Sequence, residues 1–94
     1  MFTTFIRFKV KDYETWKREY DKGLTLRKTY GVRAAGVYRN AKDASEVTAA
    51  QQTESLEAAL AMANSDELKS RMAEAGVIGP PEIWFTEDIE QVPY

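Results

Sequence analysis

Large apolar side chains occur on both faces of the first strand that the sequence predicts. Thr3–Val10 is rich in aromatic and β-branched residues, as strands are, and side chains alternate between the two faces of a strand. Ile6 therefore lies on one face and Phe5 on the other. The last predicted strand, 82–86, has the same character, because Trp84 opposes its apolar neighbours. A bare apolar sheet face is rare on a monomer, so we expect two copies to pair sheet against sheet.

Two segments have the periodicity of amphipathic helices. The first, 12–30, starts at an N-cap aspartate and is expected to break near Gly23. Its apolar stripe consists of Tyr13, Trp16, Tyr20 and Leu24. The second follows the capping residue Ser55, is interrupted at Asn64, restarts at once and ends at Gly76. Each segment therefore offers an apolar face that can pack on a sheet.

The middle of the chain predicts a hairpin. Segments 32–39 and 46–53 have the composition of strands, and the polar, turn-prone linker 40–45 joins them. Near the end of the chain, Pro80-Pro81 forbids helix, so the last strand is expected to begin at Glu82.

The order of these elements predicts the fold. Strand, helix, strand, strand, helix, strand is the βαββαβ order of a ferredoxin-like α+β domain. We expect one domain over 1–94, in which a four-stranded antiparallel sheet carries both helices on one face. The acidic tail, 87–94, is expected either to cross to a partner subunit through Ile89, Val92 and Tyr94 or to be disordered.

The chain contains no histidine and no cysteine. These absences exclude a Cys/His zinc site, a Ser–His–Asp triad, a thiolate nucleophile and a histidine haem ligand. The five glycines are scattered, so there is no Gly-rich phosphate loop, and no tight acidic cluster argues for a metal site. We expect neither a cofactor nor a metal. Any acid–base catalysis would have to use Asp, Glu, Lys, Tyr or water.

Charge and hydropathy narrow the range of partners. Thirteen basic and fifteen acidic residues give a net charge of −2, which provides no footprint for nucleic acid or an anionic membrane. No apolar run approaches the roughly 20 residues of a membrane span, and the N-terminal residues lack a signal-peptide core. We expect a cytoplasmic protein whose partners are a second copy and a small molecule.

Three stretches of the chain resemble the dimeric α/β-barrel superfamily: Arg7–Lys17, Gly31–Arg33 and Gly76–Glu82. The resemblance covers 3–85. The small proteins that the chain resembles are similar to antibiotic-biosynthesis monooxygenases, polyketide-cyclase-like proteins and stress-responsive barrel proteins. It implies a homodimer whose two sheets face each other, with a pocket between sheet and helices in each subunit. It implies less about the reaction, because the superfamily hosts oxygenases, cyclases, haem-degrading enzymes and proteins without known activity.

One position departs from the superfamily pattern. Members often carry histidine where this chain has Phe8, and a phenyl ring cannot carry a proton. Oxygenases of the kind that the resemblance implies need no metal or flavin. They hold a reduced aromatic substrate in a pocket and let it react with oxygen, and few protein groups take part in the chemistry. Haem-degrading members typically ligate iron through histidine, which this chain lacks.

Six side chains are predicted to bind a small molecule, and they are Arg7, Tyr13, Trp16, Tyr38, Gln52 and Trp84. The guanidinium of Arg7 suits an anionic or enolate group, and the alternative is an ion pair with Glu54, Glu82 or another carboxylate. Tyr13 and Trp16 suit a pocket mouth, and the alternative is ordinary core packing.

The third strand supplies the most unusual composition. Ala49-Ala50 followed by Gln51-Gln52 places small groups beside amides, which suits the lining of a cavity that orients a carbonyl or hydroxyl group. The alternative is that a large neighbour, Trp84 or Leu60, fills the space. Tyr38 is either a hydrogen-bond donor or proton carrier, or a half-buried strand aromatic.

Two functions follow from this pattern. The first is an oxygenase or cyclase without bound cofactor, acting on an aromatic or polyketide-like molecule. The alternative is a non-catalytic dimer that binds a ligand, responds to stress or serves as an interaction module. A cavity of about 300 Å3 or more with convergent polar groups favours the enzyme, and a filled pocket favours the alternative.

Overall fold

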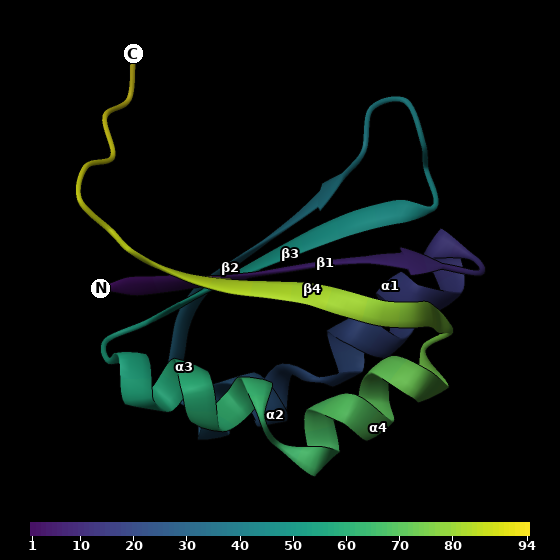
Figure 1. Ribbon diagram of the computed structural model, residues 1–94, viewed down its shortest axis with the longest axis horizontal. Coiled ribbons are helices and arrows are strands. Elements are labelled where there is room, and N and C mark those ends of the chain that lie inside the picture. Colours follow the sequence, from purple (N-terminus) through teal and green to yellow (C-terminus); the bar gives the residue numbers. More distant parts are fainter.

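The computed structural model describes residues 1–94 and orders them in the predicted sequence of elements, with each predicted helix divided in two (Figure 1). The elements are β1 (Phe2–Val10), α1 (Tyr13–Lys22), α2 (Leu24–Thr29), β2 (Val32–Arg39), β3 (Glu46–Thr53), α3 (Leu56–Ala63), α4 (Asp66–Glu74) and β4 (Val77–Glu87). The four strands form one antiparallel sheet in the order β2-β3-β1-β4. All four helices lie on one side of it (Figure 1). The predicted ferredoxin-like α+β fold is therefore confirmed.

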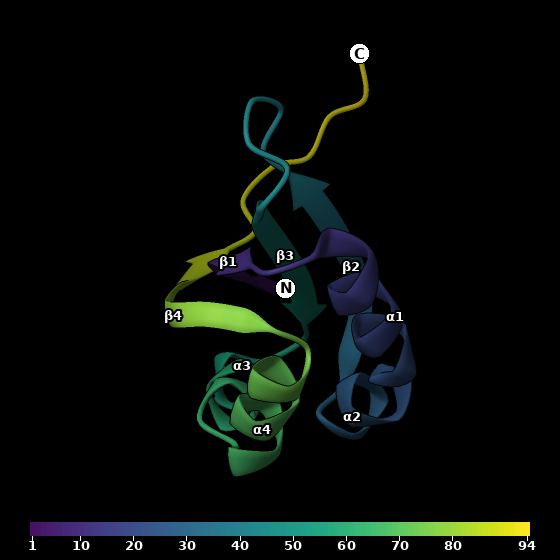
Figure 2. The same ribbon diagram turned by 90° about the vertical axis from the view of Figure 1, so that its right-hand side faces the viewer.

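The helix boundaries follow from capping. Asp12 accepts a hydrogen bond from the amide of Thr15 at 2.9 Å and starts α1, and the first helical segment breaks at Gly23, as predicted. Ser55 and Ser65 cap α3 and α4 through their hydroxyl oxygens, because a free first-turn amide needs an acceptor. Figure 2 shows the result, in which α1 and α2 form one pair beside the pair of α3 and α4. None of these helices has the length and apolar character needed to cross a bilayer.

The prediction that the last strand begins at Glu82 is wrong. β4 begins at Val77, and its pairing with β1 shifts between the Arg7–Glu82 and Lys9–Ile78 partners. Proline cannot donate to a ladder, but an edge strand tolerates it at a bulge, and β4 is an edge strand. The two prolines therefore interrupt the pairing without preventing the strand.

The core lies between the sheet and the helices. Every second residue of β1 from Thr4 to Val10 is buried. Within this row Phe8 packs against Trp16 of α1, with ring centroids 5.3 Å apart. Val47 and Ala49 of β3 complete the same cluster. This burial supplies most of the hydrophobic stabilisation of the fold.

The opposite sheet face, hereafter the open face, also carries large apolar groups. The ring of Phe5 stacks on the indole of Trp84 with centroids 5.5 Å apart and planes inclined by 16°. Trp84 is 39% exposed and Tyr38 61% exposed. Charged side chains share this face, because Arg7 pairs with Glu82 at 2.7 Å. The two-sided character predicted for the strands is therefore present in the structure.

Candidate ligand-binding cavity

A cavity of about 60 Å3 lies between the two helix pairs, with the sheet as its floor. Trp16 and Tyr20 of α1 form one wall, and Met62, Leu68 and Met72 from α3 and α4 form the other. Its polar lining consists of Glu19, Arg27, Gln51 and Arg71. This helix–sheet cavity therefore combines an apolar interior with a few polar groups, as small-molecule sites do.

Gln51 is the polar group at the floor of the cavity. β3 alternates between its two faces, so Gln51 lies on the helix side with Val47 and Ala49. Its side chain is only 4% exposed, and its carbonyl oxygen Oε1 has no hydrogen-bond partner. A buried acceptor left unpaired costs about 1–3 kcal/mol, and such groups in native proteins call for an explanation. A ligand that donates a hydrogen bond to Gln51 would provide one.

The aromatic wall combines packing with a hydrogen-bond donor. Trp16 is buried in the core, and its ring lies 5.0 Å from that of Tyr20, centroid to centroid. Burial raises the pKa of the Tyr20 phenol, although the nearby charges of Arg27 and Lys17 oppose the shift. Tyr20 therefore stays protonated at neutral pH and can donate but not act as a base.

The structure does not bring the six predicted binding residues together. Only Trp16 lines the helix–sheet cavity. Tyr13 packs beside Trp16 at 6.0 Å and lies under the guanidinium of Arg39 at 4.6 Å. The other four, Arg7, Tyr38, Gln52 and Trp84, belong to the open face.

The open-face residues have partners within the chain. Arg7 forms the ion pair with Glu82 that was the alternative to substrate binding, and its guanidinium also lies 5.9 Å from the Trp84 ring centroid. Gln52 donates to Asp88 at 2.6 Å. Sequence reasoning chose Gln52 and missed Gln51, although Gln51 shares the register of the apolar Val47 and Ala49. The spacing groups Gln51 with these two residues, and the pairing of β1 with β3 then places all three on the helix side.

Two grooves lie on the open face. One, of about 290 Å3, runs over a floor of small residues, Ala34, Gly36 and Ala50. The other, of about 310 Å3, lies between Arg7, Lys9, Glu46 and Ile78. Of the two small residues of β3, Ala50 faces the first groove, whereas Ala49 is buried in the core on the other face. These grooves are large enough for a ligand, but they are open to solvent, and polar and apolar groups both line them.

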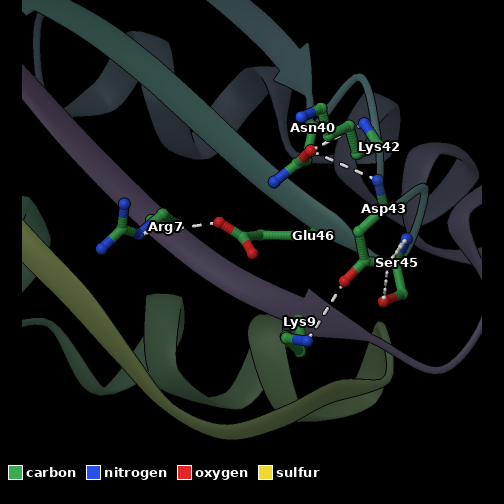
Figure 3. Close-up of polar contacts among 7 residues, drawn as sticks. All are labelled: Arg7, Lys9, Asn40, Lys42, Asp43, Ser45 and Glu46. Carbon is green, nitrogen blue, oxygen red and sulfur yellow. Dashed lines mark hydrogen bonds and ion pairs between the residues drawn. The ribbon is translucent and has the colours of Figure 1, made fainter.

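The hairpin between β2 and β3 is held in a fixed shape at one end of the open face (Figure 3). Asn40 Oδ1 accepts from the amide of Lys42 at 2.8 Å. Asp43 accepts from the hydroxyl of Ser45 at 2.6 Å and from Lys9 Nζ of β1 at 3.1 Å. These hydrogen bonds, those from Ser45 first, lower the pKa of Asp43 to about 2. The hairpin is therefore tied to the central strand.

The C-terminal tail leaves the sheet at Asp88. The amide of Asp88 donates to Met1 O at 2.9 Å, and its carboxylate accepts from Thr3 at 2.5 Å and from Gln52. These hydrogen bonds lower the pKa of Asp88. Beyond it the side chains of Ile89, Val92 and Tyr94 are exposed. Figure 1 shows the tail and the β2–β3 hairpin projecting beyond the sheet, away from the helices.

Comparison with solved structures shows a shared fold. A protein from Bordetella bronchiseptica assigned to the antibiotic biosynthesis monooxygenases has a TM-score of 0.78 at 9% identity, over 95% of this chain and 97% of that one. SnoaB, a cofactor-independent oxygenase from Streptomyces nogalater, has a TM-score of 0.76 at 10% identity, over 99% and 97%. Rv0793 from Mycobacterium tuberculosis has a TM-score of 0.71 at 14% identity, over 98% of both chains.

These comparisons define the fold class of the chain. The chain has the ferredoxin-like fold of the antibiotic-biosynthesis-monooxygenase-like proteins along its whole length, which confirms the predicted resemblance at the level of the fold. No protein-family model matches the sequence, and no curated protein matches it. Fold alone does not define a reaction, so function has to be argued from the cavity.

Proposed function

We propose that this protein binds a small aromatic or polyketide-like molecule in the helix–sheet cavity and oxygenates it without a bound cofactor. The observation that carries the proposal is Gln51, which lines a cavity with an aromatic wall at Trp16 and whose buried Oε1 has no hydrogen-bond partner. A flat, apolar ligand with one donor group complements this lining. The fold shared with proteins named antibiotic biosynthesis monooxygenases, and with SnoaB, supports the same class of reaction.

The chemistry of such a reaction requires little from the protein. A CH2 group of a reduced aromatic ring becomes a carbonyl, and one O2 supplies the carbonyl oxygen and the oxygen of one water, so the substrate provides all four electrons. The first step is removal of a C–H proton to give an enolate. Glu19 supplies the carboxylate of the cavity lining and receives this proton in the proposal. Tyr20 donates to the substrate oxygen.

Phe8 plays no direct part in this scheme. Its ring is buried against Trp16 at 5.3 Å, so the position that often carries histidine in similar proteins here serves packing. The proton acceptor in the proposal therefore lies on α1, not on β1.

We also propose that a second copy covers the open face. The stacked pair of Phe5 and Trp84 and the exposed ring of Tyr38 form its apolar part. Positive side chains of β1 alternate with carboxylates of the neighbouring strands, as at Arg7 and Glu82, which suits a two-fold interface in which each patch meets its copy. The groove over Ala34 and Ala50 leaves room for side chains of a partner.

A second candidate function is a non-catalytic, ligand-binding dimer. The specific observation that favours it is the size of the cavity, because about 60 Å3 is well below the roughly 300–1,000 Å3 of typical ligand pockets. In the oxygenase proposal, ligand binding displaces Leu68 and Met72, which are half-buried. Met72 is unbranched and flexible, and Leu68 can adopt another rotamer.

Oxygen consumption with a hydroxylated anthrone, a tricyclic ketone with one reactive CH2 group and a phenolic hydroxyl that can donate to Gln51, tests the oxygenase. We expect oxygen uptake above the rate in buffer, and we expect Gln51→Leu to lower it by about tenfold or more while Gln52→Leu stays within about twofold. Gln52 is the matched control, because it is the same residue on the opposite face. Binding of the hydroxylated anthrone without uptake would favour the non-catalytic function, and equal loss in both variants would overturn the site.

A further inference from the structure

Two arginines from opposite helix pairs approach the same point at the mouth of the helix–sheet cavity. A methyl group placed on Gly23 would lie 3.1 Å from Arg27 Nη1 and 3.9 Å from Arg71 Nη1. Arg27 belongs to α2 and Arg71 to α4, and both line the cavity. Gly23 is itself buried at the junction of α1 and α2, so one nitrogen of each guanidinium group lies near this junction.

The positive charge at this mouth is only partly compensated within the chain. Arg27 forms no ion pair, and its Nη1 donates to the backbone oxygen of Tyr20 at 2.8 Å. The guanidinium of Arg27 lies over the Tyr20 ring, 4.0 Å from its centroid. Arg71 approaches only Glu67, at 3.7 Å between Nε and Oε1, and both side chains are partly exposed. Most of the donors of the two guanidiniums therefore remain free.

The carboxylates near the mouth have other partners. Glu19 lines the cavity, but its Oε1 accepts from Lys22 at 3.1 Å. Asp21 accepts from Lys17 at 2.6 Å. Two like charges that converge without a shared counter-ion repel each other, and arginine pairs are well suited to bind planar anions through forked hydrogen bonds.

We infer that the ligand of this cavity is an anion with an aromatic or other apolar body. Its carboxylate, or an equivalent planar anionic group, lies between Arg27 and Arg71. Its body extends inward past Trp16 toward Gln51, which is 4% exposed and has an unpaired acceptor. This inference rests on the proposed function for the choice of cavity, and it adds the charge of the ligand and the residues that select it.

The test compares 1-naphthoate with 1-naphthamide, which has the same ring system and nearly the same shape but no charge. Titrations of the unmodified protein are followed by NMR through the indole NH of Trp16 and the side-chain amide of Gln51. We expect both signals to shift and naphthoate to bind about tenfold or more tightly than naphthamide, since hydrogen bonds to charged groups are the stronger ones.

Charge-removing variants assign the selectivity to the two arginines. Arg27→Gln and Arg71→Gln are each expected to weaken naphthoate binding about tenfold while leaving naphthamide binding within about twofold. Lys28→Gln and Lys69→Gln remove a charge from the same two helices at exposed positions and serve as controls with no expected effect.

Three outcomes are decisive. A preference for naphthoate that disappears in the arginine variants supports the inference. Equal affinities for the two probes, with shifts at Trp16 and Gln51, would overturn the inference and leave the proposed cavity standing. If neither probe moves those signals at saturating concentration, the cavity is not a site for aromatic ligands, and both proposals fail.

Discussion

Asp88 accepts a hydrogen bond from the side-chain amide of Gln52 at 2.6 Å, and this contact fixes the point at which the chain leaves the sheet. Thr3 donates to the other carboxylate oxygen. Strands β1 and β3 therefore hold the start of the tail together, on the face where we propose that a second copy binds.

Acidification is expected to release the tail. Hydrogen bonds from Thr3, the larger cause, and from Gln52 lower the pKa of Asp88 below its usual 3.8. A carboxylate whose pKa is lower in the folded state contributes stability above its unfolded pKa and loses it as the pH falls through the folded value. Carbon-detected NMR titration of Asp88 checks this shift. Thr3→Val should move the midpoint back toward 3.8, and an unchanged midpoint would contradict the contact.

The hairpin carboxylate Asp43 should titrate near pH 2. Its pKa of about 2 results mainly from hydrogen bonds donated by Ser45, with a smaller part from Lys9. The stabilising effect on the hairpin is therefore complete at neutral pH and decreases only as the pH falls from about 3.8 through 2. We expect Ser45→Ala to raise the NMR midpoint more than Lys9→Met does. The reverse order would mean that the ion pair dominates.

The open face is expected to hold the dimer together. Sedimentation at micromolar concentration should show a particle of twice the 10.7 kDa chain mass. Trp84→Glu places a charge in the stacked pair with Phe5 and should give a single-chain particle, because burying an unpaired charge is costly. Leu24→Glu is the control, since Leu24 is also exposed but lies on α2, away from the open face. A wild-type protein that sediments as a single chain would refute the interface.

Replacement of Gln51 should stabilise the protein while removing its function. The unpaired Oε1 of Gln51 is buried, and an apolar side chain of similar size avoids a desolvation cost of about 1–3 kcal/mol. We therefore expect Gln51→Leu to raise the free energy of unfolding in urea. Gln52→Leu should lower it, because that change removes the hydrogen bond to Asp88. A loss of stability in Gln51→Leu would show that its amide has a structural role.

Local signals in the sequence were sufficient to predict the fold. The caps at Asp12 and Ser55, the break at Gly23 and the bounds of the hairpin strands all depend on neighbouring residues. The start of β4 could not be predicted from neighbouring residues. Proline is tolerated there because β4 is an edge strand, and the order of the strands in the sheet determines which strand lies at the edge.

The site was less accessible to sequence reasoning. Both faces of the sheet carry large apolar groups, so the alternation in β1 and β3 separates two faces without showing which one the helices cover. The pairing of Ile6 with Ala49 places Gln51 on the helix side. Arg7 and Trp16 were grouped as one candidate site, although the sheet lies between them. The approach of Arg27 and Arg71 to the same cavity depends on the positions of two helix pairs that are distant in sequence.

The face on which the ligand binds is tested most directly by NMR contacts between the bound hydroxylated anthrone and methyl groups labelled in methionine and alanine. Met62 and Met72 line the helix–sheet cavity, whereas Ala34 and Ala50 line the groove on the open face. We predict nuclear Overhauser effects from the anthrone rings to the two methionine methyls and none to these two alanines. Contacts to Ala34 and Ala50 in place of the methionines would contradict the account.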